Sequence, residues 1–178
     1  MSRLRSFPLF IAVITLFPSC EFSCSIGQKD EIKGTAEVKD GTRLYNGINL
    51  ETNGVRVDKA YLLLGDGKRV SDDNFVDFKQ TVRLQLIIDS GWVEQEGKVL
   101  LGAAEKITAE NGTTVLQEDD LFQNYPSGIT ATDARSIYLS ATLKLKENTS
   151  PTSFTVSFHV WDKRGAGWIK GSYKLYSK

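Results

Sequence analysis

Three stretches of the sequence alternate apolar and polar residues with a period of two. Residues 81–89 read TVRLQLIID, residues 136–146 read SIYLSATLKLK, and residues 153–161 read SFTVSFHVW. Successive side chains of a β-strand point to opposite faces, so each stretch has one apolar face. This pattern is typical of antiparallel sheets covered on one side. The predicted buried residues are Val82, Leu84, Leu86, Ile88, Ile137, Leu139, Ala141, Leu143, Leu145, Phe154, Val156, Phe158 and Val160.

The stretches are separated by turn signals at short intervals, which predicts about seven to nine strands. Asn111-Gly112 is the dipeptide most typical of a hairpin turn. One short helix is expected within EDDLFQNYP, residues 118–126, where Asp119 can cap it and Pro126 can end it. We therefore predict an all-β fold, an antiparallel β-sandwich, over residues 36–178. A partly closed β-barrel is the alternative.

The N-terminal residues have the pattern of an export signal. MSRLR carries two arginines and no acid, and the SFPLFIAVITLF of residues 6–17 has no charge. A basic start, a short apolar run and a small residue at the exit predict a signal peptide over residues 1–19. The run is shorter than the roughly 20 apolar residues of a spanning helix. Residues 20–35 are polar and aperiodic, and we expect them to form a flexible tether.

The exit of this segment, FPSC, places Ser19 directly before Cys20. A small residue before a cysteine is similar to the lipobox of bacterial lipoproteins, so Cys20 is the expected lipidation site. Several acyl chains on Cys20 would hold the protein on a membrane. The expected location is a bacterial cell envelope, anchored at the outer membrane or its periplasmic face. The alternative is a secreted protein with a disulfide between Cys20 and Cys24.

Composition excludes several function classes. Lys+Arg and Asp+Glu number 22 each, so no global charge favours nucleic acid as a partner. A single histidine argues against most metal sites. Asp72, Asp73, residues 118–120 and Asp162 could supply oxygen ligands to calcium, but they lack the spacing of a calcium loop. No nucleophile has a visible base, and no carboxylate pair stands out. We expect no cofactor, no metal and no enzymatic activity.

The last two predicted strands, SFTVSFHVW and WIKGSYKLY, fit a single pairing register. If Trp161 faces Trp168, every inward pair is apolar or combines a large with a small side chain. A slip of one residue would turn each apolar set to the other face. The inward pairs are Val160 with Ile169, Phe158 with Gly171, Val156 with Tyr173, and Phe154 with Leu175. The outward pairs include Trp161 with Trp168 and His159 with Lys170.

This register puts two tryptophans side by side at the mouth of the loop DKRGAG, residues 162–167. Cross-strand aromatic pairs stabilise hairpins by up to about 1 kcal/mol, so packing alone can explain them. The other interpretation is a flat recognition surface for a sugar ring or a partner protein. Its candidate ligand-binding residues are Trp161, Trp168, His159 and Arg164.

The export segment ending in Cys20, the tether and the terminal VWDKRGAGWIKGSYKL resemble, in overall style, small envelope lipoproteins of Bacteroidetes-type bacteria. The resemblance implies a location and a fold more than a mechanism. Three function classes remain, in this order: a non-catalytic binding module for a glycan or protein, a structural or assembly component of the envelope, and an enzyme with carboxylate chemistry.

Overall fold

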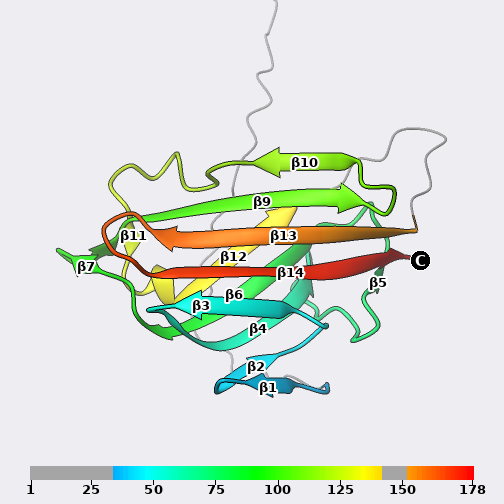
Figure 1. Ribbon diagram of the computed structural model, residues 1–178, viewed down its shortest axis with the longest axis horizontal. Coiled ribbons are helices and arrows are strands. Elements are labelled where there is room, and N and C mark those ends of the chain that lie inside the picture. Colours follow the sequence, from blue (N-terminus) through cyan, green and yellow to red (C-terminus); the bar gives the residue numbers. More distant parts are fainter. Residues whose placement is uncertain (1–33, 142–151) are drawn as a thin grey trace, which may run out of the picture.

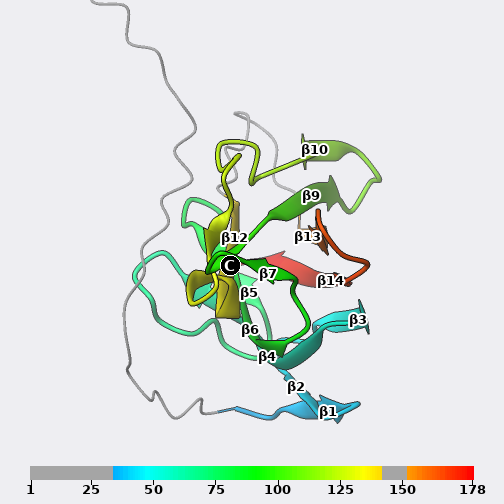
Figure 2. The ribbon, with the colours of Figure 1, turned by 90° about the vertical axis from the view of Figure 1, so that its left-hand side faces the viewer.

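The computed structural model describes residues 34–141 and 152–178 of the chain. Within these ranges the protein is all-β, with one 3-10 turn, and its two main sheets face each other (Figures 1 and 2). The fold class predicted from the sequence is therefore confirmed. The expected signal peptide (residues 1–19) and Cys20, with most of the expected tether (residues 20–35), lie outside the described residues.

The first sheet has the strand order β1-β2-β4-β6-β12 and lies at the back in Figure 1. Its strands are β1 (Glu37–Lys39), β2 (Thr42–Leu44), β4 (Arg56–Leu64), β6 (Val82–Ser90) and β12 (Ser136–Ala141). The pairing is antiparallel except for the short parallel contact between β2 and β4. β4 and β6, each nine residues long, form the middle of this sheet.

The second sheet has the order β10-β9-β13-β14-β3, and β5 pairs in parallel with the end of β14. Its strands are β3 (Asn49–Asn53), β5 (Phe75–Val76), β9 (Leu101–Ala109), β10 (Thr114–Glu118), β13 (Ser153–Asp162) and β14 (Trp168–Ser177). A small third sheet holds β7 (Glu94–Gln95), β8 (Lys98–Val99) and β11 (Ile129–Thr130). β9 and β10 form the hairpin expected at Asn111-Gly112, with Gly112 at φ 84°.

The core fills the space between the two main sheets. The predicted faces of β6 and β13 are buried throughout: Val82, Leu84, Leu86, Ile88, Phe154, Val156, Phe158 and Val160 are all at most 5% exposed. Ile137 and Leu139 of β12 are buried as well. Of the remaining predicted positions, Leu143 and Leu145 lie outside the described residues. The period-two pattern therefore identified the inner face of the sandwich correctly.

This core contains the carboxyl group of Glu105. Glu105 of β9 is 2% exposed and lies opposite Phe158 in the register, on the same side as Ile107. Its Oε1 atom has no hydrogen-bond partner, and burial raises the pKa of this carboxyl to about 7. The pKa of buried Tyr173 is raised, first by burial and then by the charge of Glu105.

The helix expected over residues 118–126 is wrong. The segment forms consecutive turns, and within the described ranges the only helical turn is the 3-10 turn η1 (Asp133–Arg135). The reason is a tertiary contact: Oδ1 of Asp120 accepts from the backbone N–H groups of Phe122 and Ala103, and Leu121 N–H donates to the Ala103 carbonyl. These bonds fasten the segment to β9 and leave Phe122 in the core. No described helix has the length and apolar character needed to cross a membrane.

The barrel alternative is also wrong for the part of the chain that the structure describes. β1 and β12 are the edges of the first sheet, and β10 and β3 are the edges of the second, so the strands do not join into one closed ring. Among the described residues, eight strands have five or more residues, within the seven to nine expected; the additional strands are two or three residues long.

Candidate functional site

The outer face of the second sheet carries a pair of tryptophans on neighbouring strands. Trp161 of β13 lies opposite Trp168 of β14, as the sequence predicted, and the row continues to Gly102 of β9 and Asn53 of β3. The next outward row places His159 opposite Lys170. We call Trp161, Trp168, His159 and Lys170 the aromatic platform.

Trp161 lies directly over Gly102. A Cβ atom built on Gly102 would overlap the Cε2, Cζ2 and Nε1 atoms of the indole, so only a glycine leaves room for the ring. The indole therefore covers the backbone of β9 and stays partly exposed on its other side. This contact holds the ring against a strand of the sheet. A surface held in this way is preorganised for ligand binding.

His159 lies between the two tryptophans. Its ring centroid is 5.0 Å from that of Trp161 and 6.4 Å from that of Trp168, which it meets edge-on at 80°. The Nζ atom of Lys170 lies 4.9 Å from the centroid of the Trp168 ring, a cation–π geometry. Burial, and then the charge of Lys170, lower the pKa of His159. Near neutral pH its imidazole is therefore uncharged, with one hydrogen-bond donor and one acceptor.

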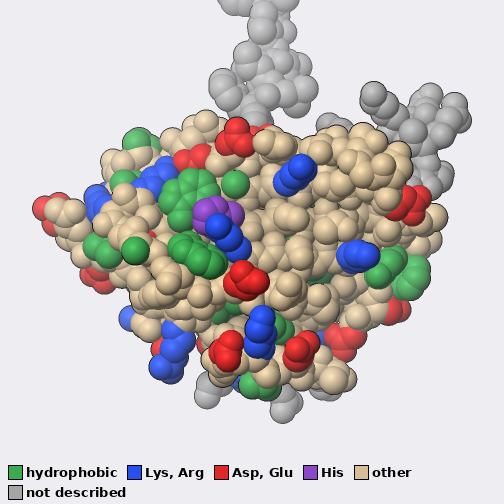
Figure 3. Space-filling view, in the orientation of Figure 1, with side chains coloured by type: hydrophobic (Ala, Val, Ile, Leu, Met, Phe, Trp, Pro, Cys, Tyr) green, Lys and Arg blue, Asp and Glu red, His purple; other side chains and the backbone are tan. Residues whose placement is uncertain are grey.

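Figure 3 shows this face from the front. Apolar side chains gather around the histidine at the left end of the face and again at the right end. Between them lies a band of mostly uncharged polar surface with scattered charges. Ser157, Ser172, Thr155 and Lys174 are the outward residues of β13 and β14 in this band. The platform is thus bordered by side chains that can donate and accept hydrogen bonds.

The loop beside the platform is held by Asp162, which is 4% exposed. Its Oδ1 accepts from the N–H groups of Arg164 and Gly165, at 2.8 and 3.1 Å. Its Oδ2 accepts from the N–H of Val93 at 2.6 Å, which ties the loop to the segment before β7. The carboxylate that the sequence suggested as a possible calcium ligand thus bonds to backbone donors.

Arg164 occupies an exposed position in this loop, and the hydrogen bond that the structure gives it is made by its backbone. Within the described residues it shares no ring contact, hydrogen bond or ion pair with the platform. Its neighbour Lys163 instead forms an ion pair with Asp120 at 2.5 Å. Burial alone would raise the pKa of Asp120, but the hydrogen bonds from Lys163, Phe122 and Ala103 together hold it below its ordinary value.

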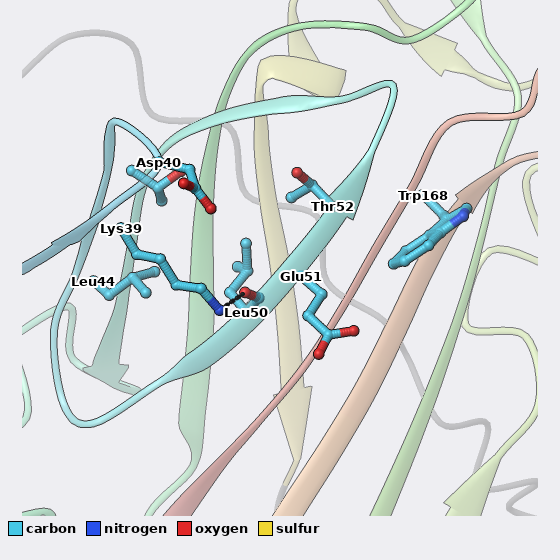
Figure 4. A pocket seen from close by; sticks show the side chains of 8 residues that line it. Lys39, Asp40, Leu44, Leu50, Glu51, Thr52 and Trp168 are labelled. Carbon is cyan, nitrogen blue, oxygen red and sulfur yellow. Dashed lines mark hydrogen bonds between the residues drawn. The ribbon is translucent and has the colours of Figure 1, made fainter.

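Trp168 is also one wall of a cleft of about 330 Å³. Figure 4 shows the cleft between β3 and the β1–β2 hairpin, with Trp168 at its side. The other lining residues are Lys39, Asp40, Thr42, Leu44, Leu50, Glu51 and Thr52. Sequence reasoning missed this cleft because its residues come from three separate segments, and no local pattern joins them.

The acidic side chains of the cleft do not face each other. Asp40 and Glu51 are its two acidic residues, and Figure 4 shows the carboxylate of Glu51 turned away from Asp40. The Nζ atom of Lys39 donates to the carbonyl of Leu50 at 3.3 Å, which binds the hairpin to β3. In residues 34–141 and 152–178 no three His, Cys, Asp or Glu side chains form a group that could hold a metal ion.

Comparison with known proteins gives a likeness in structure. No family model matches it, and no curated protein matches it either. Among solved structures, the chain is similar to the C-terminal domain of Wzt, with 11% sequence identity and a TM-score of 0.46. This likeness covers 79% of the present chain and 82% of the other. At this distance it identifies neither a ligand nor a site.

Proposed function

We propose that the protein is a non-catalytic binding module and that its aromatic platform holds a glycan. The observation that carries this proposal is the seating of Trp161 over Gly102, with His159 between the two tryptophans. A pyranose ring has a face of C–H groups and an edge of hydroxyl groups. An indole ring can stack on such a face, and polar side chains beside the indole can form hydrogen bonds with the hydroxyl groups.

The surroundings of the platform support a glycan more than a protein subunit. The neutral imidazole of His159 can donate and accept a hydrogen bond, and Ser157 and Ser172 follow along the same strands. Within residues 34–141 and 152–178 the exposed large apolar residues lie on separate elements: Val38, Phe75, Val93, Val115 and Tyr176. Phe75 and Tyr176 are in ring contact. An assembly surface would be expected to gather such side chains into one patch.

Affinity electrophoresis tests the proposal directly. The full-length protein is run through native gels that contain soluble neutral polysaccharides: a glucan, a mannan and a xylan. We expect at least one to retard the wild type and to leave the Trp161→Ala/Trp168→Ala variant unretarded. Val115→Ala, an exposed apolar residue on β10, is the matched control and should migrate like the wild type. Equal retardation of the double variant, or retardation by none of the gels, would overturn the proposal.

We also propose that the protein is anchored in a bacterial envelope through lipid on Cys20. The support is the sequence pattern of a basic start, an apolar run and Ser19 before Cys20. Expression in a bacterium with a lipoprotein pathway, followed by membrane fractionation, tests this. The wild type should sediment with membranes and Cys20→Ala should be released, while Cys24→Ala should behave like the wild type. A Cys20→Ala protein that stays with the membranes would contradict the anchor.

A further inference from the structure

A second concave site lies on the same face of the second sheet, toward the opposite end from the platform. It is a groove of about 410 Å³ lined by residues of β13, β14 and β3 and of two loops. Its lining is almost entirely polar: Asn46, Gly47, Asn49, Asp72, Asp73, Asn74, Thr155, Ser172, Tyr173, Lys174 and Tyr176. Hydroxyl, amide and charged groups thus surround a space large enough for part of a ligand.

Two buried asparagines form the floor of this groove. Asn46 is 2% exposed and Asn74 is 6% exposed, and both have left-handed backbones, with φ of 57° and 58°. The Nδ2 of Asn46 donates to Oδ1 of Asn74 at 3.0 Å, and the Nδ2 of Asn74 donates to the Asn46 carbonyl at 2.7 Å. Asn46 also accepts from Leu62 N–H at 3.0 Å, and Asn74 donates to the Lys174 carbonyl at 2.8 Å. A well-bonded polar network of this kind holds the groove in one shape.

Beyond the floor, the groove ends at a second aromatic pair. Tyr176 lines the groove and lies opposite Phe75 in the parallel pairing of β14 with β5. Their ring centroids are 5.4 Å apart, and the two side chains are 36% and 44% exposed. Two exposed rings in contact form a continuous apolar surface beside polar groups, which is the kind of surface that can meet a ligand.

The platform and the groove both lie on the outward face of β13 and β14, and we call the surface from Trp168 to Tyr176 the track. Trp168 and Tyr176 both point outward from β14, eight residues apart, which corresponds to about 27 Å at the usual rise per residue of a strand. Ser157, Ser172 and Thr155 lie between them on β13 and β14. Figure 3 shows the corresponding surface as apolar at both ends and polar between.

The charges along the groove fit a neutral chain. The charged residues that line the groove are Lys174, Asp72 and Asp73. Asp72 is paired with Arg69, and Asp73 accepts from the Ser71 hydroxyl and the Phe75 N–H. The Ser71 hydrogen bond, followed by that of Phe75, lowers the pKa of Asp73, so this carboxyl is ionised near neutral pH. The two carboxylates would repel a polyanion and accept hydrogen bonds from sugar hydroxyls.

We propose that this groove is a second glycan subsite and that the ligand is a linear neutral glycan long enough to touch both the platform and the groove. The inference rests on the proposed function. A disaccharide is far shorter than the track and would occupy one subsite, whereas a longer chain would occupy both. Joining two weak subsites through one ligand raises the affinity well above that of either subsite alone.

Calorimetric titration with neutral glucan, mannan and xylan oligosaccharides, from disaccharides to chains longer than the track, tests the inference. For the wild type we expect long chains to bind about tenfold or more tightly than the matching disaccharide. Tyr176→Ala should remove most of this advantage of long chains over the disaccharide, and Tyr176→Phe should restore it. Ser172→Phe, which places a ring in the groove lining between Trp168 and Tyr176, should also reduce this advantage.

The outcomes separate this inference from the proposed function. If Tyr176→Ala and Ser172→Phe keep the full chain-length dependence while the double tryptophan variant loses binding, the second subsite is wrong and the platform stands. The same holds if the wild type binds long chains no better than disaccharides. If no oligosaccharide of the three series binds the wild type, both proposals fall. Circular dichroism and thermal unfolding of each variant confirm that any loss occurs in a folded protein.

Discussion

The indole of Trp161 occupies the space that any side chain at residue 102 would need, because Gly102 lies directly beneath it in the pairing of β13 with β9. The two residues are therefore coupled: the orientation of the ring depends on the absence of a Cβ atom on the neighbouring strand. An aromatic ring supported in this way loses little conformational freedom when a ligand binds to its exposed side.

Gly102→Ala should displace Trp161 without unfolding the protein. The added methyl group would overlap three indole atoms, and overpacking of this kind costs about 1–3 kcal/mol. Near-ultraviolet circular dichroism should show a changed tryptophan signal, and glycan retardation should be lost. Gly65→Ala is the control, because its Cβ would find its nearest neighbour at an ordinary 3.5 Å. A Gly102→Ala protein with unchanged dichroism would show that Trp161 does not depend on this contact.

Phe158→Ala should destabilise the protein far more than Ser157→Ala. The Phe158 ring fills the space above Gly171, where a built Cβ would lie 2.5 Å from its Cζ, and the side chain is 4% exposed. Truncating such a residue costs roughly 3–5 kcal/mol. Ser157 is exposed on the opposite face, so its loss should stay within about 0.5 kcal/mol. Urea unfolding measures both, and equal losses would contradict the observed register.

Because of Glu105, the free energy of unfolding of the wild type should decrease as the pH rises from about 4.5 to about 7. The unfolded chain releases this proton near the ordinary pKa of 4.5, whereas the folded state keeps it up to about pH 7. The folded state therefore binds the extra proton only between these values. Stability contributed by this group is fully present below about pH 4.5 and falls by about 3 kcal/mol in total as the pH rises to about 7.

Glu105→Gln removes this ionisation and keeps the shape of the side chain. Urea unfolding of both proteins at about pH 5 and about pH 8 should show a smaller decrease for the variant than for the wild type. His159, whose pKa is lowered, acts in the opposite direction, so the informative quantity is the difference between the two proteins. Identical pH dependence in both would show that Glu105 is not buried in its neutral form.

The sequence predicted the terminal hairpin to the residue because two independent constraints agreed there. The apolar residues of both strands alternate, and the one large-to-small pair, Phe158 with Gly171, allows a single register. That register in turn placed Trp161, Trp168 and His159 on one face, as the structure shows. Whether these residues bind a ligand could not follow from the pattern, because stacking that stabilises a hairpin uses the same residue types.

Other features depend on contacts between distant segments and left no local signal. Leu121, Phe122 and Tyr125 have a spacing that suits a helix. Two hydrogen bonds override it: Asp120 accepts from the Ala103 N–H of β9, and the Leu121 N–H donates to the Ala103 carbonyl. The cleft beside Trp168 and the groove on Asn46 and Asn74 are each assembled from several segments. Glu105 occupies an inward position of β9 and is buried there. Its burial could not be predicted from the sequence, because an ionisable residue is normally expected at the surface.

Tryptophan fluorescence during a glycan titration tests whether Trp161 and Trp168 are the contact surface. The chain has three tryptophans, and the third, Trp92, is outside the platform and donates from Nε1 to the Ala134 carbonyl at 3.1 Å. A polysaccharide that retards the wild type should change its emission in a saturable way. The Trp161→Ala/Trp168→Ala variant, with Trp92 as its only indole, should show no change. Saturable binding that leaves the wild-type emission unaltered, or that alters the emission of the double variant equally, would contradict a binding role for the two tryptophans.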